Sequence, residues 1–304
     1  MKIAVVGTGA IGSYYGGKLA YQGCDVHFLV RSGLAKIKRS GIRIRGKKAN
    51  FHIARAQAYK TADAIGPCDL VLIALKATNN EALLRLIPPL LHPRTILLTL
   101  QNGLGNEDFL AQHFGADRVM GGLCFICLNR ISPALIEHHD YGYLTIGEFT
   151  GPPESRTRAV AQEFQESGMT CRVVDNLMQE RWGKLVWNIP FNGLTIAAGG
   201  ITTEDILQDD SLHSAALALM NEVIEGAKGC GYNLPGDVAV EHMRLTETMG
   251  AYKPSTLLDF EAGRALEVEA IWGEPLRRAC TRGIAMPRLE QLYALLKSLN
   301  ARRE

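Results

Sequence analysis

The segment KIAVVGTGAIGSYYGGKLAYQG, residues 2–23, decides the predicted fold. It begins with a short apolar run rich in β-branched residues, which is typical of a buried parallel strand. Gly7, Gly9 and Gly12 follow, and the remainder can form a helix that ends at Gly23. A second apolar run, CDVHFLV, comes next at residues 24–30. The glycines therefore lie between a strand and a helix of a compact βαβ unit, which is the context that a dinucleotide-binding loop requires.

Each glycine of this loop has its own role in binding a pyrophosphate. Gly7 permits the tight turn, Gly9 lets the pyrophosphate approach the backbone, and Gly12 lets the helix pack closely on the strand. The helix N-terminus offers free N–H groups and the positive end of its dipole. We therefore predict that the cofactor is bound by the loop residues Gly7, Thr8, Gly9, Ala10, Ile11 and Gly12.

The end of the second predicted strand indicates which cofactor is bound. An NAD site usually has an acidic residue there, which accepts hydrogen bonds from the ribose hydroxyls. This chain has FLVRSG instead, and the guanidinium of Arg31 suits a 2′-phosphate. Lys36, Lys38 and Arg39 add positive charge nearby. The sequence thus predicts NADP(H), and the alternative is that Arg31 is a solvated loop residue.

Alternating strands and helices continue to about residue 150. CDLVLIALKA is predicted to be a strand that ends at Lys76, and RTILLTLQNGLGN one that ends at Gln101 and Asn102. Ligands of open parallel sheets bind beyond the carboxyl ends of the strands, so Lys76 and Asn102 are predicted to line the cofactor site. Ordinary loop residues are the alternative. Three more strands are expected to close the domain, in RVMGGLCFICLN, ALIEHHD and YLTIGEF.

Helical periodicity dominates the second half of the chain. RAVAQEFQESG reads as a helix, CRVVD as a last strand, and long helices follow. We therefore predict an α/β Rossmann-type N-terminal domain over residues 1–175 and an all-α C-terminal domain over residues 176–304. Ser255 or Thr256 is expected to cap a helix, and Gly283 and Pro287 to end the last helical turn.

The segment WGKLVWNIPFN, residues 182–192, combines a polar stripe with bulky apolar residues. Lys184, Asn188 and Asn192 recur every four residues, which places all three on one side of a helix. A stripe that faces water would be an ordinary solvated surface, whereas a stripe that faces a ligand would form the wall of an active site. Pro190 lies within the segment and predicts a kink near Val186.

Composition narrows the class of protein. The 304 residues carry a formal net charge of +2, which gives no electrostatic reason to expect nucleic acid or membrane partners. No apolar run is long enough to span a membrane, and the N-terminus lacks the layout of a signal peptide. Seven scattered cysteines fit reduced thiols in a cytoplasmic protein. Neither Cys124 with Cys127 nor His138 with His139 has the geometry of a metal pair, and no metal is predicted.

Several motifs together resemble the ketopantoate reductase (2-dehydropantoate 2-reductase) family, in the right order over nearly the full length. They are GTGAIG, LKA at residues 75–77, QNGLGN at 101–106, RWGKLVWNIPFNGLTIA, PSTLLDFEAGRALEVEAIWG and RGIAMP. The resemblance implies NADPH-dependent reduction of 2-dehydropantoate, or a similar α-keto acid, to a 2-hydroxy acid such as pantoate. Pantothenate biosynthesis is the implied pathway.

The resemblance also implies roles for individual residues. Lys184 would be the general acid and Glu267 its catalytic partner, while the substrate would be held by Asn188 and Asn192 and its carboxylate by Ser255. Lys76 and Asn102 would line the cofactor and the cleft. The chain departs from the family pattern near Thr202, in ITTEDI, and near Tyr252, in AYKP, so the identity of the keto acid stays open.

The proposed chemistry explains why an amine and two amides are needed. Hydride transfer to a ketone places negative charge on the carbonyl oxygen, and an ammonium can both stabilise that charge and donate the proton. Amides can bind hydroxyl and carbonyl oxygens without adding charge. Alternatives remain for two residues, because Glu267 could instead pair with Arg264 at the surface, and Ser255 could serve only as a helix cap.

Two rival functions are compatible with parts of the sequence. A β-hydroxyacid dehydrogenase that acts on another small acid also uses a lysine followed four residues later by an asparagine. A protein that senses NADPH without turnover is a rival from another functional class. The oligomeric state is not determined by the sequence, and a homodimer is one candidate.

Overall fold

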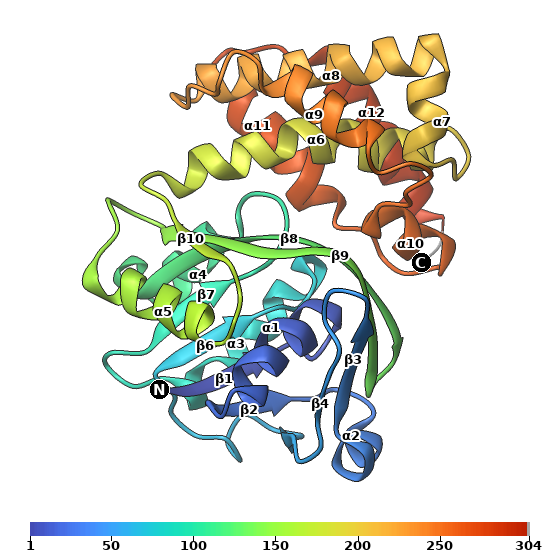
Figure 1. Cartoon of the computed structure of the whole chain (residues 1–304). Coiled ribbons are helices and arrows are strands. Elements are labelled where there is room, and N and C mark those ends of the chain that lie inside the picture. Colours follow the sequence, from blue (N-terminus) through green and yellow to red (C-terminus); the bar gives the residue numbers. More distant parts are fainter. Residues whose placement is uncertain (303–304) are drawn as a thin grey trace. The chain divides into compact units, whose positions relative to one another are not determined.

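The computed structural model describes residues 1–302, which form two compact units (Figure 1). The first unit consists of Met1–Gln101 and Asn106–Leu177, and the second of Asn102–Gly105 and residues 178–302. The first unit is an α/β structure built on one sheet, and the second is helical. In the described part of the chain, no helix is both long and apolar enough to cross a bilayer.

A mixed ten-stranded sheet forms the centre of the first unit, in the order β4-β3-β9-β8-β7-β6-β1-β2-β5, with β10 paired to β9. The strands β8-β7-β6-β1-β2-β5 are parallel to their neighbours, and β8 pairs antiparallel with β9. The strands are β1 (Lys2–Val6), β2 (Asp25–Leu29), β3 (Ile42–Gly46), β4 (Phe51–Ile53), β5 (Gln57–Tyr59), β6 (Leu70–Ile73), β7 (Ile96–Thr99), β8 (Val119–Ser132), β9 (Leu135–Glu148) and β10 (Cys171–Val173).

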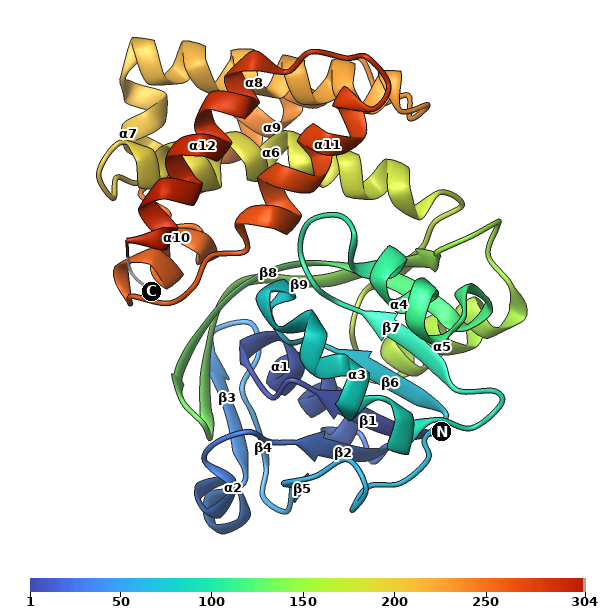
Figure 2. The same ribbon diagram turned by 180° about the vertical axis from the view of Figure 1, so that it is seen from behind.

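Helices cover both faces of this sheet, as the continuous apolar strands require. On one face α1 (Ala10–Tyr21) and α5 (Ser155–Glu166) share a buried core with the sheet that includes Val5, Phe28 and Phe164. On the other face α3 (Leu83–Leu86) and α4 (Asn106–Phe114) pack on a core that includes Val6 and Leu110. The two faces can be followed in Figures 1 and 2, and α2 (Leu34–Ser40) follows β2.

Two predicted strands end earlier than expected. β6 ends at Ile73 rather than at Lys76, and β7 ends at Thr99 rather than at Asn102. Val6, Ile73 and Thr99 are paired in register, so the ladder stops where β1 turns away after Val6. The runs ALIEHHD and YLTIGEF were predicted as separate strands but form the single strand β9, whose pairing with β8 contains register shifts.

The second unit is all-α, as predicted. Its elements are α6 (Leu177–Ala197), α7 (Thr203–Gln208), α8 (Asp210–Gly229), α9 (Val238–Glu247), α10 (Ser255–Glu261), the π-helical turn η4 (Glu269–Gly273), α11 (Glu274–Cys280) and α12 (Pro287–Ala301). Helix α6 runs through Pro190 as one element. The buried indole of Trp272 donates a hydrogen bond to the carbonyl of Ile189 at 3.0 Å, which ties the π-helical turn to α6.

Two helix boundaries in this unit differ from expectation. Pro254 occupies the N-cap position of α10, so neither Ser255 nor Thr256 caps the helix, and Ser255 is its exposed first residue. Pro287 does not end a helical turn but begins α12, a helix that was not predicted. Proline suits the first helical position because its missing N–H would have no partner there.

The loop 102–105 is fixed to the π-helical turn by the backbone. The N–H of Leu104 donates to the carbonyl of Ala270 at 2.9 Å. Gly103 has φ +82°, and a Cβ atom there would lie 2.2 Å from the same carbonyl oxygen. Asn102 is therefore held by the helical unit, although it follows β7 closely in the sequence.

This close contact gives a test of how the loop is anchored. We expect Gly103→Ala to lower the free energy of unfolding by about 1–3 kcal/mol more than Gly263→Ala, because only the first adds a steric clash with backbone. Gly263 also has positive φ, at +66°, but no heavy atom lies within 4 Å of a Cβ built there. Urea unfolding of both variants measures the difference, and equal losses would contradict the close packing at Gly103.

Candidate active site

The glycine loop has the geometry that pyrophosphate binding requires. Gly7 has φ +105°, and a Cβ atom there would lie 2.4 Å from the backbone nitrogen of Leu75. A Cβ atom on Gly12 would lie 2.2 Å from the carbonyl oxygen of Gly7. At Gly9, by contrast, no atom lies within 4 Å of the corresponding position. The turn and the helix contact thus exclude side chains at Gly7 and Gly12, while the backbone at Gly9 is open to a ligand.

The neighbours of Gly9 prepare the N-terminus of α1 for an anion. Gly9 is the N-cap residue of α1, and no side chain caps the helix. Thr8 is buried, and its hydroxyl donates to the carbonyl of Leu29 at 2.8 Å. The side chain of Thr8 therefore ties the loop to the end of β2, which leaves backbone N–H groups from Ala10 and Ile11 as the donors that a phosphate could use.

Of the two other predicted cofactor residues in this unit, Arg31 lies just beyond β2 and Lys76 just beyond β6. Arg31 is exposed, and its carbonyl accepts a hydrogen bond from the Lys60 amine at 2.5 Å. Lys76 is half-buried and is the N-cap residue of the 3-10 turn Ala77–Ala82. Both positions lie beyond the carboxyl ends of parallel strands, where ligands of such sheets bind.

A network of amides shapes the chain after β7 and was not predicted. The hydroxyl of Thr99 donates to Gln101 Oε1 at 2.9 Å, and the Gln101 amide donates to Asn80 Oδ1 at 2.7 Å. The Asn80 amide in turn donates to Asn106 Oδ1 at 3.0 Å. Gln101 and Asn106 are almost fully buried, so these bonds fix both ends of the segment that carries Asn102. The polar residues of the QNGLGN motif are the feature of the sequence from which this network could have been predicted.

The polar stripe on α6 is not a solvated surface. Asn188 and Asn192 are only 6% and 4% exposed. Their amide groups hydrogen-bond to no residue in the described chain, yet they are not sealed from solvent. The amine of Lys184, one turn earlier on α6, donates to Asn102 Oδ1 at 3.0 Å. The amine and the two amides therefore share one face of α6, and Asn102, predicted as a cofactor residue, is a partner of Lys184.

The structure distinguishes Glu267 from the neighbouring carboxylates. Glu267 is 5% exposed. Glu269 is a surface residue that pairs with Arg277 at 2.7 Å and accepts from the Tyr293 hydroxyl. Arg264, the surface partner considered for Glu267, pairs instead with Asp259 at 2.8 Å. A carboxylate buried this deeply is unusual, which marks Glu267 as a functional candidate.

Helix α9 braces the part of α6 that carries Lys184, and the sequence had no signal for this. The His242 ring donates to the carbonyl of Gly183 at 3.0 Å, and burial lowers the pKa of His242. The Trp187 indole donates to the Thr246 hydroxyl at 2.9 Å, and that hydroxyl donates to the His242 carbonyl. The turn of α6 from 183 to 187 is therefore held on both sides of Lys184.

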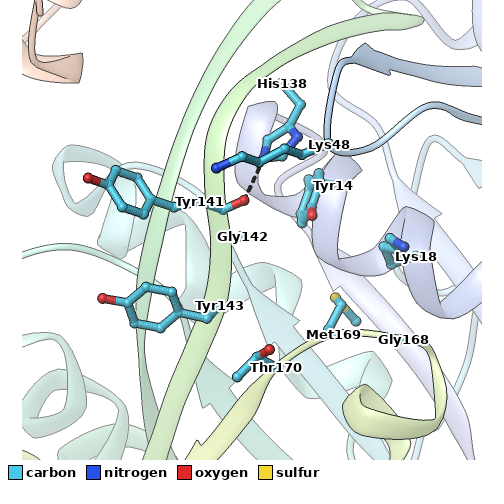
Figure 3. Close-up of a pocket in the computed structure, with 10 residues that line it drawn as sticks. All are labelled: Tyr14, Lys18, Lys48, His138, Tyr141, Gly142, Tyr143, Gly168, Met169 and Thr170. Carbon is cyan, nitrogen blue, oxygen red and sulfur yellow. Dashed lines mark hydrogen bonds between the residues drawn. The ribbon is translucent and has the colours of Figure 1, made fainter. Parts of the chain in front are cut away.

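A surface pocket of about 250 Å³ lies elsewhere on the α/β unit (Figure 3). Tyr14, His138 and Gly142 line it, together with Lys18 and Lys48. The Lys48 amine pairs with Asp140, and His138 Nε2 donates to the Tyr141 carbonyl at 2.8 Å, so these groups are engaged with the protein. None of the predicted site residues lines this pocket. Among residues 1–302, no group of three or more His, Cys, Asp or Glu side chains could hold a metal ion.

Comparison with known proteins gives consistent matches over the whole chain. The family model described as ketopantoate reductase PanE/ApbA matches residues 3–151, and the model of its C-terminal part matches residues 176–300. A 2-dehydropantoate 2-reductase from Nostoc sp. is 38% identical, over 99% of this chain and 96% of that protein. A crystal structure of 2-dehydropantoate 2-reductase from Geobacter metallireducens is 41% identical with a TM-score of 0.96, over 98% of this chain and 99% of that one.

The glycine loop generates a prediction that separates folding from binding. We expect Gly12→Ala to lose about 1–3 kcal/mol of stability and to weaken NADPH binding, because its Cβ would collide with the Gly7 carbonyl. Gly9→Ala should keep its stability but bind NADPH at least roughly tenfold more weakly, because its Cβ occupies the approach of the pyrophosphate. Thermal unfolding and fluorescence titration test both variants. Unchanged NADPH affinity in Gly9→Ala would contradict the assigned phosphate loop.

Proposed function

Because the chain belongs to the ketopantoate reductase family of NADP-dependent oxidoreductases, we propose that it reduces 2-dehydropantoate to pantoate with NADPH. The observation that carries this proposal is the hydrogen bond of 3.0 Å from the Lys184 amine to Asn102, on the same helix face as two buried amides that hydrogen-bond to no residue among 1–302. This arrangement matches what a keto acid requires, which is a proton donor for the ketone oxygen and neutral donors for its other oxygens.

The residues of the α/β unit fit the proposed cofactor. The backbone at Gly9 is open, Gly7 and Gly12 leave no room for side chains, and the uncapped start of α1 suits a pyrophosphate. Arg31 would face the 2′-phosphate, and Lys76 would contact the cofactor beyond β6. When bound, NADPH supplies the hydride that reduces the keto carbon.

We assign the protonation step to Lys184. As the ketone carbon is reduced, its oxygen gains negative charge, and the ammonium of Lys184 stabilises that charge and donates the proton that completes the hydroxyl. Asn102 orients the amine by accepting a hydrogen bond from one of its three N–H groups. The bracing of α6 by His242 and Thr246 limits motion of the turn that carries Lys184. In this assignment Asn102 serves the proton donor as well as the cofactor.

The remaining site residues are proposed to bind the substrate. Asn188 and Asn192 would use their amides for the hydroxyl and carbonyl oxygens of the keto acid. Ser255 would bind the carboxylate, and its exposed position at the start of α10 leaves the hydroxyl accessible. Glu267 would be the catalytic partner of Lys184, a role in which a buried carboxylate keeps a nearby ammonium charged.

The wider context follows from the same proposal. Residues 1–175 would be the NADP-binding domain and residues 176–304 the substrate domain. The enzyme would act in the cytoplasm, in pantothenate biosynthesis. A homodimer is proposed as the assembly, since a structural neighbour of 21% identity is described as a dimeric ketopantoate reductase from Staphylococcus aureus.

A substrate panel tests the proposed reaction. We expect the near-ultraviolet absorbance of NADPH to fall when 2-dehydropantoate is added. The absorbance should fall more slowly when NADH replaces NADPH, or when another small α-keto acid replaces 2-dehydropantoate. Oxidation of a β-hydroxyacid at a higher rate would favour the dehydrogenase alternative. Tight NADPH binding without turnover of any keto acid would favour a sensor.

The role of Lys184 is tested by its removal. Lys184→Ala should reduce kcat by a factor on the order of 10²–10⁴, the usual contribution of a general acid, while NADPH affinity stays nearly constant. Lys228→Ala, which removes an exposed lysine at the end of α8, is the matched control and should leave kcat unchanged. Wild-type turnover in Lys184→Ala would end the assignment of this residue as proton donor.

A further inference from the structure

Two arginines that are far apart in the sequence are brought to the same edge of the sheet. Arg31 follows β2, and Arg130 lies near the carboxyl end of β8. The turn between β8 and β9 packs against the loop after β2, because a Cβ atom on Gly33 would lie 2.3 Å from the Pro133 side chain. This packing places the end of β8 beside the segment that carries Arg31.

The two guanidiniums form a cluster of positive charge that no carboxylate neutralises. Partial burial lowers the pKa of Arg130, and the nearby guanidinium of Arg31 lowers it further. Lys60 adds a third cation through its hydrogen bond to the Arg31 carbonyl. Within residues 1–302, no acidic side chain forms an ion pair with Arg31 or Arg130. Like charges brought together without a counter-charge repel each other, and an anion bound there would remove that repulsion.

Two other arginines of the same unit do have carboxylate partners. On the neighbouring strand pair β3 and β9, Arg45 pairs with Glu137, and Arg156 on α5 pairs with the buried Glu148. The register sets Arg130 opposite Ile136, an apolar residue. Arg130 therefore has no carboxylate directly across from it in the β8–β9 pair.

We propose, on the basis of the NADP(H) use proposed above, that Arg130 is a second specificity-determining residue, which binds the 2′-phosphate of the cofactor together with Arg31. The pyrophosphate is served by the start of α1, and Thr8 joins that loop to the end of β2. The ribose of a dinucleotide lies beyond the end of this strand, and a 2′-phosphate there would meet two guanidiniums. Each can form charge-assisted hydrogen bonds with a dianion, and NADH has no group to receive them.

Binding measurements test this role without depending on turnover. We expect Arg130→Gln to raise the Kd of NADPH by roughly fivefold to thirtyfold and to leave the Kd of NADH unchanged. Arg130→Lys should be intermediate, because it keeps the charge and loses the planar fork. Arg94→Gln is the control, since it removes an exposed arginine before β7, at the opposite edge of the sheet, and should change neither Kd.

A second probe isolates the phosphate. The mononucleotide 2′-AMP should compete with NADPH in the wild type more strongly than 5′-AMP, and Arg130→Gln should remove that difference to the same degree as Arg31→Ala. Equal losses of NADPH and NADH affinity in Arg130→Gln would show a structural effect and overturn the proposal. Wild-type affinities for both cofactors in this variant would overturn it as well. If 2-dehydropantoate is not reduced but the ratio of NADPH to NADH affinity still depends on Arg130, the result supports the role of Arg130 in binding the 2′-phosphate and contradicts the proposed reaction.

Discussion

The attachment of residues 102–105 to the π-helical turn is the constraint on which the proposed site depends. The contact needs a residue without a Cβ at Gly103, because the carbonyl of Ala270 lies where that atom would be. The hydrogen bond from Leu104 to the same carbonyl completes the attachment. As a result, Asn102 accepts a hydrogen bond from Lys184, and a loop next to a strand of the sheet becomes part of the helical unit.

Both halves of the proposed chemistry rest on polar groups that the protein leaves available. On α6, two nearly buried amides have no partner in the described chain, which is costly unless a ligand or water satisfies them. Among residues 1–302, neither Arg31 after β2 nor Arg130 on β8 forms an ion pair with an acidic side chain. By contrast, the amides around Gln101 and the pair of Arg156 with Glu148 are satisfied within the protein.

Local sequence patterns predicted the elements better than their ends. The Rossmann-type unit, the all-α unit and the helix that carries the lysine stripe were confirmed. The predicted ends of β6 and β7 were wrong, because a strand ends where it stops pairing with its neighbours and not where the apolar run of its sequence ends. The predicted helix cap at Ser255 was wrong, because Pro254 occupies the N-cap position of α10. Helix α12 was not predicted, because Pro287 was expected to end a helical turn, whereas it begins α12.

By itself, the sequence determined the glycine loop and the polar stripe and predicted their chemistry, because both depend on residues close together in the chain, where backbone geometry sets which side chains share a face. Only the tertiary structure decided that Asn102 accepts a hydrogen bond from Lys184, that Glu267 rather than Glu269 is buried, and that the end of β8 packs beside the segment that carries Arg31. Those relations join segments separated by many residues. They follow from the order of the strands, the packing of the helices and the path of the β8–β9 hairpin. The local periodicity of the sequence does not predict any of these.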